Sequence, residues 1–212
     1  FPYTTLFRSI PLFVFMGILL QKSEVAEQLL ETMGRLFGGL RGGLGVSVIL
    51  VGALLAASTG IVGATVIAMG MIALPTMLRN GYKPSLASGI VCTSGTLGQI
   101  IPPSTLLIIL SDVMSNSYQQ AQFELGKFSV ETISVGQIFA AAIFPGLLLV
   151  VIYITYLLLY AWIFPNSAPP QKQLEKKATW PEVAGVILPP VLLILAVLGS
   201  ILGGITNPTP AA

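Results

Sequence analysis

Charged residues and histidine are scarce in this chain. Lys, Arg, Asp and Glu together make up 8% of its 212 residues, and it has no histidine. A water-soluble domain carries about 25% charged residues, because these side chains normally remain on its surface. The absence of histidine excludes histidine-based acid–base catalysis, the usual zinc sites and haem ligation. We therefore expect no enzymatic activity, no transition-metal site and no organic cofactor.

The few charges and the cysteine exclude further classes. Ten basic and eight acidic residues leave a net charge of +2, which is too balanced for a nucleic-acid-binding surface. The one cysteine cannot form an internal disulfide. Apolar residues, in contrast, make up 54% of the chain. The solvent for most of this chain must be a lipid bilayer, which predicts an all-α, multi-pass membrane protein, because a helix satisfies its own backbone hydrogen bonds.

Apolar runs and polar intervals divide the chain into segments. Residues 1–9 match the translation of a widely used sequencing adapter, so we treat them as an artefact and exclude them from the fold. Residues 10–20 are about half of a spanning helix, which needs about 20 apolar residues. The further predicted segments are an amphipathic arm helix with a glycine-rich linker at 21–43, a hairpin at 44–78, a broken transmembrane helix at 85–110, a loop at 111–137, a transmembrane helix at 138–164, a loop at 165–182 and a transmembrane helix at 183–204.

Basic residues predict which loops share a side of the membrane. The segments at 21–43, 79–84 and 165–182 carry most of the Lys and Arg residues, whereas the loop at 111–137 has only Lys127. Loops rich in Lys and Arg remain in the cytoplasm. We therefore place the first three segments on the cytoplasmic side and the fourth on the opposite side.

The apolar run at 44–78 is too short for two full spans. It has 14 residues before the polar break at 58–60 and 18 residues after it, whereas two spans need about 40 residues and a turn. A re-entrant helical hairpin, which enters and leaves on the same side, fits these lengths. Two short, tilted spans remain the alternative.

Polar groups at membrane depth gather at two breaks. One is the tip of the hairpin, and the other is the segment 94–104, where Pro102 and Pro103 remove backbone donors and free the carbonyls of Gly98 and Gln99. Hydroxyl and carbonyl oxygens suit an alkali cation, and a helix N-terminus favours an anion. Candidate ligands for a cation and a substrate are Ser58, Thr59, Gly60, Thr65, Ser94, Gly95, Thr96, Gly98, Gln99, Pro102 and Ser104.

Transport and simple helix packing both explain these breaks. Small and hydroxyl residues also pack membrane helices together, so each break alone has a structural interpretation. Two broken segments in one chain favour transport, because discontinuous helices form the binding sites of secondary transporters.

Several motifs along the chain are distinctive. They are Ile10-Pro-Leu-Phe-Val-Phe-Met-Gly17, Ala57-Ser-Thr-Gly-Ile-Val-Gly-Ala-Thr65, Gly81-Tyr82 with Pro84, Ser94-Gly-Thr-Leu-Gly-Gln-Ile-Ile-Pro-Pro-Ser104 and the final Gly204-Ile-Thr-Asn-Pro-Thr-Pro-Ala-Ala212. In order over nearly all of 10–212, these motifs resemble those of one known family, the DctM-like large membrane subunit of tripartite ATP-independent periplasmic (TRAP) transporters.

The resemblance implies a mechanism and partners. Such proteins are sodium-coupled secondary transporters of the ion-transporter superfamily, built from two inverted repeats that move by an elevator motion. A periplasmic binding protein (DctP-like) delivers an organic acid, such as a C4-dicarboxylate, and a small subunit (DctQ-like) completes the complex in the bacterial inner membrane. By resemblance, Ser58, Thr59 and Gly60 form the tip of the first hairpin. Ser94, Gly95, Thr96 and Pro102 form the matching unwound helix beside it.

This chain also departs from the family pattern. Its hairpin tip reads Ala57-Ser-Thr-Gly60 where many members have Ser-Gly-Ser-Ser. By resemblance it contains only the first repeat, with 205–212 beginning the second, so we expect a truncated permease. A related sodium-coupled anion carrier that works without a binding protein is the alternative function.

Overall fold

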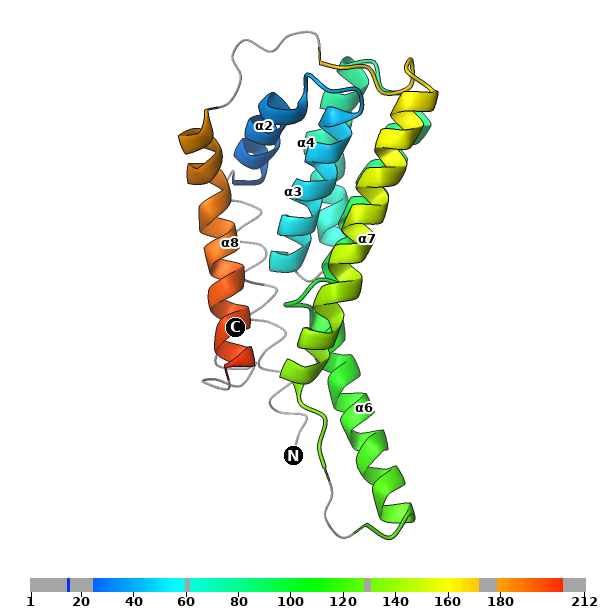
Figure 1. Ribbon diagram of the computed structural model, residues 1–212, viewed down its shortest axis with the longest axis vertical. Helices are drawn as coiled ribbons and strands as arrows, with labels where there is room; N and C mark the ends of the chain where they lie inside the picture. Colours follow the sequence, from blue (N-terminus) through cyan, green and yellow to red (C-terminus); the bar gives the residue numbers. More distant parts are fainter. Residues whose placement is uncertain (1–14, 16–24, 60–61, 128–130, 172–178, 204–212) are drawn as a thin grey trace.

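The computed structural model describes residue 15 and residues 25–59, 62–127, 131–171 and 179–203. The expected segments at 1–9 and 205–212 lie outside these residues, as does all of 10–20 except Phe15. Every regular element in the described part of the chain is helical (Figure 1). In order, the elements are α2 (Val25–Phe37), α3 (Gly43–Thr59), α4 (Val62–Arg79), α5 (Pro84–Thr96), the short 3₁₀ helix η1 (Leu97–Gln99), α6 (Thr105–Glu124), α7 (Val135–Ile163) and α8 (Trp180–Leu202).

Three helices among the described residues are long and apolar enough to cross a membrane, namely α4, α7 and α8. The longest, α7, has 29 residues. At about 1.5 Å per residue it is about 43 Å long, which exceeds the ~30 Å hydrocarbon core of a bilayer. The chain is therefore a helical membrane protein, as its composition predicts.

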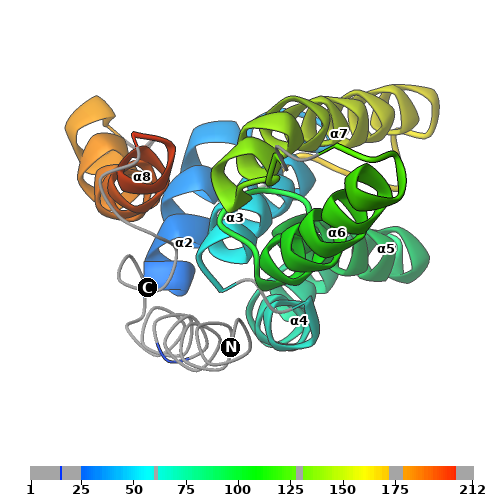
Figure 2. The same ribbon diagram turned by 90° about the horizontal axis from the view of Figure 1, so that it is seen from below.

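α3 lies at the centre of the bundle and packs against α2, α4, α5, α7 and α8 (Figure 2). Its sequence is apolar on all sides, and Val48, Ile49 and Val51 are almost fully buried. A helix without a polar face has no side that favours water, so it occupies the core.

α2 is amphipathic and covers one side of this core. Leu29 and Met33 are buried, while Arg35 on the exposed side forms an ion pair with Glu31. The buried face of α2 packs on α3 and α8. The hydroxyl of Ser47 in α3 donates a hydrogen bond to the Met33 carbonyl at 2.8 Å, which fixes α2 to the central helix.

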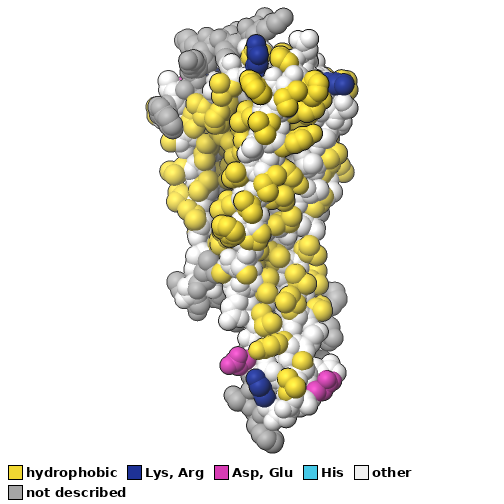
Figure 3. All heavy atoms as spheres, turned by 45° about the vertical axis from the view of Figure 1, so that its right-hand side comes forward, with side chains coloured by type: hydrophobic (Ala, Val, Ile, Leu, Met, Phe, Trp, Pro, Cys, Tyr) yellow, Lys and Arg dark blue, Asp and Glu magenta, His cyan; other side chains and the backbone are white. Residues whose placement is uncertain are grey.

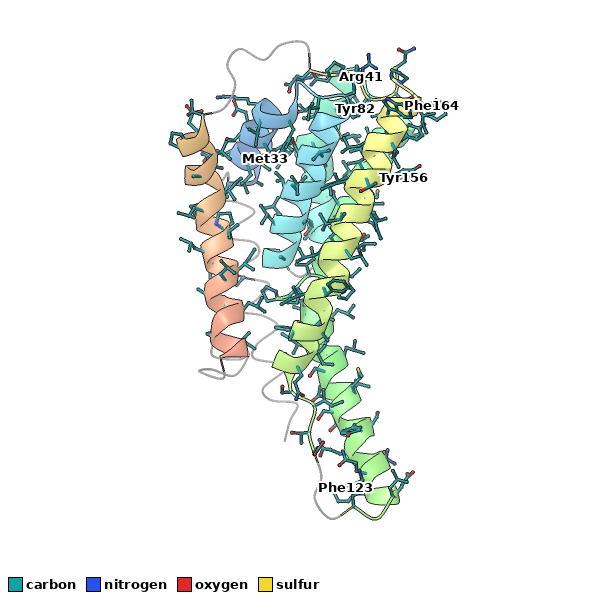
Figure 4. All side chains as sticks on the ribbon, viewed as in Figure 1. Met33, Arg41, Tyr82, Phe123, Tyr156 and Phe164 are labelled. Carbon is teal, nitrogen blue, oxygen red and sulfur yellow. The ribbon has the colours of Figure 1, made fainter. Side chains whose placement is uncertain are left out.

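α3 and α4 form a helical hairpin whose connection at 60–61 lies outside the described residues. The start of α3 and the end of α4 lie together at the base of the hairpin. The backbone N–H of Gly45, near the start of α3, donates a hydrogen bond to the hydroxyl of Tyr82, which follows α4, at 3.3 Å. Figure 4 shows Tyr82 beside Arg41 at the same end of the molecule. The hairpin shape agrees with the expectation for 44–78, while its re-entrant course in a bilayer remains a prediction.

The segment that follows α7 is hydrogen-bonded to the base of the hairpin, where α3 begins and α4 ends. The Ser167 carbonyl accepts a hydrogen bond from the Lys83 N–H, and the Ala168 carbonyl accepts one from the Gly42 N–H, both at 3.0 Å. Gly42 has a φ of +78°, which glycine adopts without the steric cost that other residues incur. Backbone hydrogen bonds thus join the linkers on both sides of the hairpin to the end of α7.

The helix after the break is longer than the sequence predicts. The expected loop at 111–137 is wrong in its first part, because α6 continues to Glu124 and only then does the chain leave the helix. Residues 115–122 are polar but contain neither Gly nor Pro, which are the residues that interrupt helices. Their polarity therefore marks the departure from lipid and not the end of the helix.

α8 also begins earlier than the span predicted at 183–204. It starts at Trp180, because the Glu182 carboxylate accepts a hydrogen bond from the Thr179 N–H at 3.2 Å and Pro181 suits the first turn of a helix.

Tyr82 offers a direct test of how the base of the hairpin is held. It is only 3% exposed, and burial raises the pKa of its hydroxyl above the usual value, so the hydroxyl stays neutral at physiological pH. We expect Tyr82→Phe to destabilise the protein by about 1–3 kcal/mol, because the buried N–H of Gly45 loses its acceptor. Thermal unfolding in detergent measures this loss. Tyr156→Phe is the control, since Tyr156 is exposed on α7, and an equal effect of both substitutions would contradict the assignment.

Candidate ion-binding site

The first predicted segment is the tip of the hairpin. Ser58 and Thr59 form the last turn of α3, where the structure describes their backbone only. Gly60 lies outside the described residues. Thr65, in the first turn of α4, is buried. The tip therefore sits between the C-terminal end of one helix, where backbone carbonyls are left without helical partners, and the N-terminal end of the next.

The second predicted segment is a complete break between α5 and α6. α5 ends at Thr96, η1 adds one tight turn, and the helix resumes only at Thr105. Pro102 and Pro103 in the break are buried. Because proline donates no backbone hydrogen bond, the helix cannot continue through this pair.

Ser104 stabilises both sides of the break. Its hydroxyl donates a hydrogen bond to the Gln99 carbonyl at 3.0 Å and accepts one from the Leu107 N–H at 3.4 Å. The first bond satisfies a carbonyl that the sequence predicts to be freed by the prolines, and the second caps the start of α6. The Ser104 side chain, which lies within the break, thus supplies the hydrogen-bond partner of the Gln99 carbonyl.

The structure brings the two breaks together. In α3, Gly52 lies so close to α5 that a Cβ atom there would stand 2.6 Å from the Cβ of Ser94. In α5, Gly95 lies against Val66 of α4 in the same way, and η1 packs on α3 and α4. α3, the start of α4 and the end of α5 therefore meet at one place in the bundle. A fourth helix covers the break, because Gly146 of α7 approaches Ile101.

The predicted site residues divide into buried and accessible ones. Ser94, Gly95 and Gly98 are buried between helices, whereas Thr96 is exposed and Gln99 half-buried. The Ser94 hydroxyl donates to the Val91 carbonyl at 3.0 Å, and the Thr96 hydroxyl donates to the Thr93 carbonyl at 2.8 Å. A hydroxyl has one hydrogen to donate and two lone pairs, so both oxygens retain lone pairs for a cation.

Gly52 and Val66 are contact residues that the sequence analysis missed. Gly45 and Gly52 stand seven residues apart, on one face of α3, and both approach α5, at Ile90 and Ser94. Glycines at this spacing in an apolar helix are a recognisable sign of close helix packing in membranes.

The site is neutral. None of the predicted site residues is ionisable, and the described part of the chain contains no group of three or more His, Cys, Asp or Glu side chains able to hold a metal ion. Hydroxyl and carbonyl oxygens are hard ligands, which suit alkali or alkaline-earth cations better than transition metals. The arrangement can thus hold a cation with neutral oxygens and leave a net positive charge beside it.

The close packing of α5 on the hairpin can be tested with two glycines of the same helix. At Gly95 a Cβ atom would stand 3.1 Å from the Cα of Val66, whereas at Gly89 it would meet nothing within 4 Å. We expect Gly95→Ala to destabilise the protein by about 1–3 kcal/mol through overpacking. Gly89→Ala should be neutral or slightly stabilising, because alanine favours helix. Thermal unfolding of both variants in detergent is the measurement, and an unchanged midpoint for Gly95→Ala would refute the contact.

Comparison with known proteins identifies the family to which this chain is similar. The model of the family described as "Tripartite ATP-independent periplasmic transporter, DctM component" matches residues 4–212. The chain is 35% identical, over 99% of its length, to the C4-dicarboxylate TRAP transporter large permease protein DctM of Pseudomonas aeruginosa, of which it covers 44%. It is 30% identical to the protein of the same name from Vibrio cholerae, covering 99% of this chain and 42% of the relative.

A further relative carries a different substrate in its name. The ectoine/5-hydroxyectoine TRAP transporter large permease protein UehC of Ruegeria pomeroyi is 30% identical over 96% of this chain, which covers 43% of it. The chain thus spans less than half the length of these curated relatives. Since the family model matches nearly every residue, this chain belongs to the DctM family of TRAP transporter components.

Proposed function

We propose that this chain is part of the large membrane subunit of a sodium-coupled secondary transporter that imports organic acids of the C4-dicarboxylate type. The proposal depends mainly on one observation, the meeting of two interrupted helices inside an apolar bundle. Discontinuous helices at membrane depth are costly unless their free backbone groups line a binding site or are satisfied by neighbours.

Sodium fits the chemistry of this place. The oxygens near the junction belong to hydroxyls and backbone carbonyls, with Thr96 and Gln99 the accessible members among the described residues. Neutral oxygens leave the charge of a bound sodium ion uncompensated, so an anionic substrate beside it completes the neutralisation. The N-terminal end of α4, with its positive helix dipole, favours the same anion. Sodium and a carboxylate would therefore stabilise each other, which couples their binding.

The relatives favour a dicarboxylate as the substrate. Two of them, at 35% and 30% identity, are named for C4-dicarboxylates, and another at 30% is named for ectoine. We propose the dicarboxylate class because the relative with the highest of these three identities is named for it.

An elevator motion of the hairpin and the broken helix, relative to the remaining helices, would carry the bound sodium ion and substrate across the bacterial inner membrane.

Partners follow from the family and from the charge distribution. The family is named as a tripartite periplasmic transporter, so we propose a small membrane subunit and a periplasmic substrate-binding protein as partners. Arg41, Arg79 and Lys83 lie at or beside the helix ends that form the base of the hairpin, and by the positive-inside rule we propose that this end faces the cytoplasm. The opposite end, with the tip of α6, then faces the periplasm (Figure 3).

Sodium-driven uptake by the complete permease tests this site. We expect Ser58→Ala and Thr96→Ala to raise the sodium concentration needed for half-maximal uptake by about tenfold each, which corresponds to the loss of one ligand worth about 1.4 kcal/mol. Uptake into vesicles at varied sodium is the measurement. Thr93→Ala is the matched control, because the Thr93 hydroxyl donates to the Gly89 carbonyl one turn earlier on α5.

The contrast between Thr96 and Thr93 separates binding from packing. An unchanged sodium activation curve in both Ser58→Ala and Thr96→Ala would favour the packing interpretation of these hydroxyls. A shift of equal size in Thr93→Ala would show that loss of any hydroxyl on α5 disturbs the helix, and would remove the support for a specific site.

A further inference from the structure

α6 continues well past the level at which its neighbours end. Leu107 and Ile108, early in α6, share one buried cluster with Phe139, near the start of α7, and Ile201, at the end of α8. α6 ends at Glu124, 16 residues after Ile108, which is about 24 Å of helix at 1.5 Å per residue. Figure 1 shows this part of α6 projecting alone beyond the bundle.

The projecting part of α6 is too polar for a lipid environment. The start of α7 marks the edge of the apolar region, because Ser134 and Gln137 form a polar capping box there, and α7 itself is longer than the ~30 Å hydrocarbon core. Residues 115–122 read Ser-Asn-Ser-Tyr-Gln-Gln-Ala-Gln, which is unsuited to lipid. We call residues 115–127 the α6 extension.

Large apolar side chains are nevertheless exposed on the α6 extension. Tyr118 is 41% exposed, Phe123 66% and Leu125 76%. Figure 4 shows Phe123 at the tip, far from the other labelled residues. Glu124 and Lys127 surround these side chains with charge. Exposed aromatic residues within a polar rim are typical of a protein–protein interface.

The extension is held in a fixed shape. Gln122 is only 4% exposed, and its amide donates a hydrogen bond to the Glu131 carbonyl at 3.1 Å and accepts one from the Glu131 N–H at 3.0 Å. This pair of bonds attaches Glu131 to the end of α6. A surface that is ordered before binding loses less entropy when a partner docks.

We propose that the α6 extension is the surface on which a water-soluble, periplasmic substrate-binding protein docks, with Phe123 and Leu125 as its apolar anchors. This inference rests on the proposed function, which supplies a soluble partner on the side opposite the basic end. The anchors are bordered by one acidic residue, Glu124, and one basic residue, Lys127, so the extension does not require a partner of one charge sign.

Uptake at varied concentrations of the purified binding protein tests the proposal. In the complete permease, Phe123→Ser with Leu125→Ser should raise the binding-protein concentration for half-maximal uptake at least tenfold and leave the maximal rate unchanged, because the anchors take no part in the ion site. Gln120→Ser, an exposed polar position of the same extension, should leave both values unchanged. An unchanged half-maximal concentration in the double variant would overturn the proposal. Wild-type uptake that needs no binding protein would instead refute the proposed function.

A fluorescent reporter distinguishes this partner from other occupants. Phe123→Cys, made in a Cys92→Ala background and labelled with an environment-sensitive dye, is placed in the complete permease in nanodiscs of anionic and of zwitterionic lipid. We expect an emission shift only when the binding protein is added. A shift caused by the lipid alone would assign the extension to the membrane surface, and a cysteine that resists labelling would assign it to the rest of the permease. Both results would overturn the proposal.

Discussion

Backbone polar groups in an apolar environment must find partners within the chain, and this constraint shapes the whole molecule. With charged residues at only 8%, there are few side chains to provide them. Continuous helices solve the problem along most of the chain. Where helices stop, the structure shows individual solutions: Ser104 at the break between α5 and α6, Tyr82 at the base of the hairpin, and the Ser167 and Ala168 carbonyls at the linkers on either side of it.

The same constraint explains why the two interruptions lie together. An interruption that faces lipid would leave carbonyls without partners, so each must be enclosed by other helices. Glycines provide the space for this enclosure. Gly52 lets α5 approach α3, and Gly146 lets α7 cover the break. Close contacts between helices thus enclose the interruption.

Composition and run lengths predict much of this architecture. The all-helical class, the hairpin shape and the interruption before Thr105 follow from apolar periodicity and from two prolines in sequence. The extent of α6 could not be predicted in this way, because polar residues were interpreted as a loop when they only mark the end of the lipid environment. Hydropathy reports the surroundings of a segment, whereas the end of a helix depends on capping and on Gly or Pro.

The candidate site was only partly predictable. The residue types at 94–104 indicate oxygen ligands, but the sequence does not reveal that the Ser104 hydroxyl satisfies the Gln99 carbonyl. Nor does it distinguish Ser94, which is enclosed by α3, from Thr96, which is accessible. These differences depend on which helix lies beside each residue, and that is a property of the tertiary packing.

The central claim is that the hairpin tip and the break form one cation site. Hydrogen–deuterium exchange of the complete permease, in sodium and in an equal concentration of potassium, tests it most directly. We predict that sodium slows exchange in both 57–65 and 94–104, segments that are distant in sequence, while the α6 extension exchanges equally in both salts. Exchange that is unchanged in both segments, or slowed in one of them alone, would contradict a shared site.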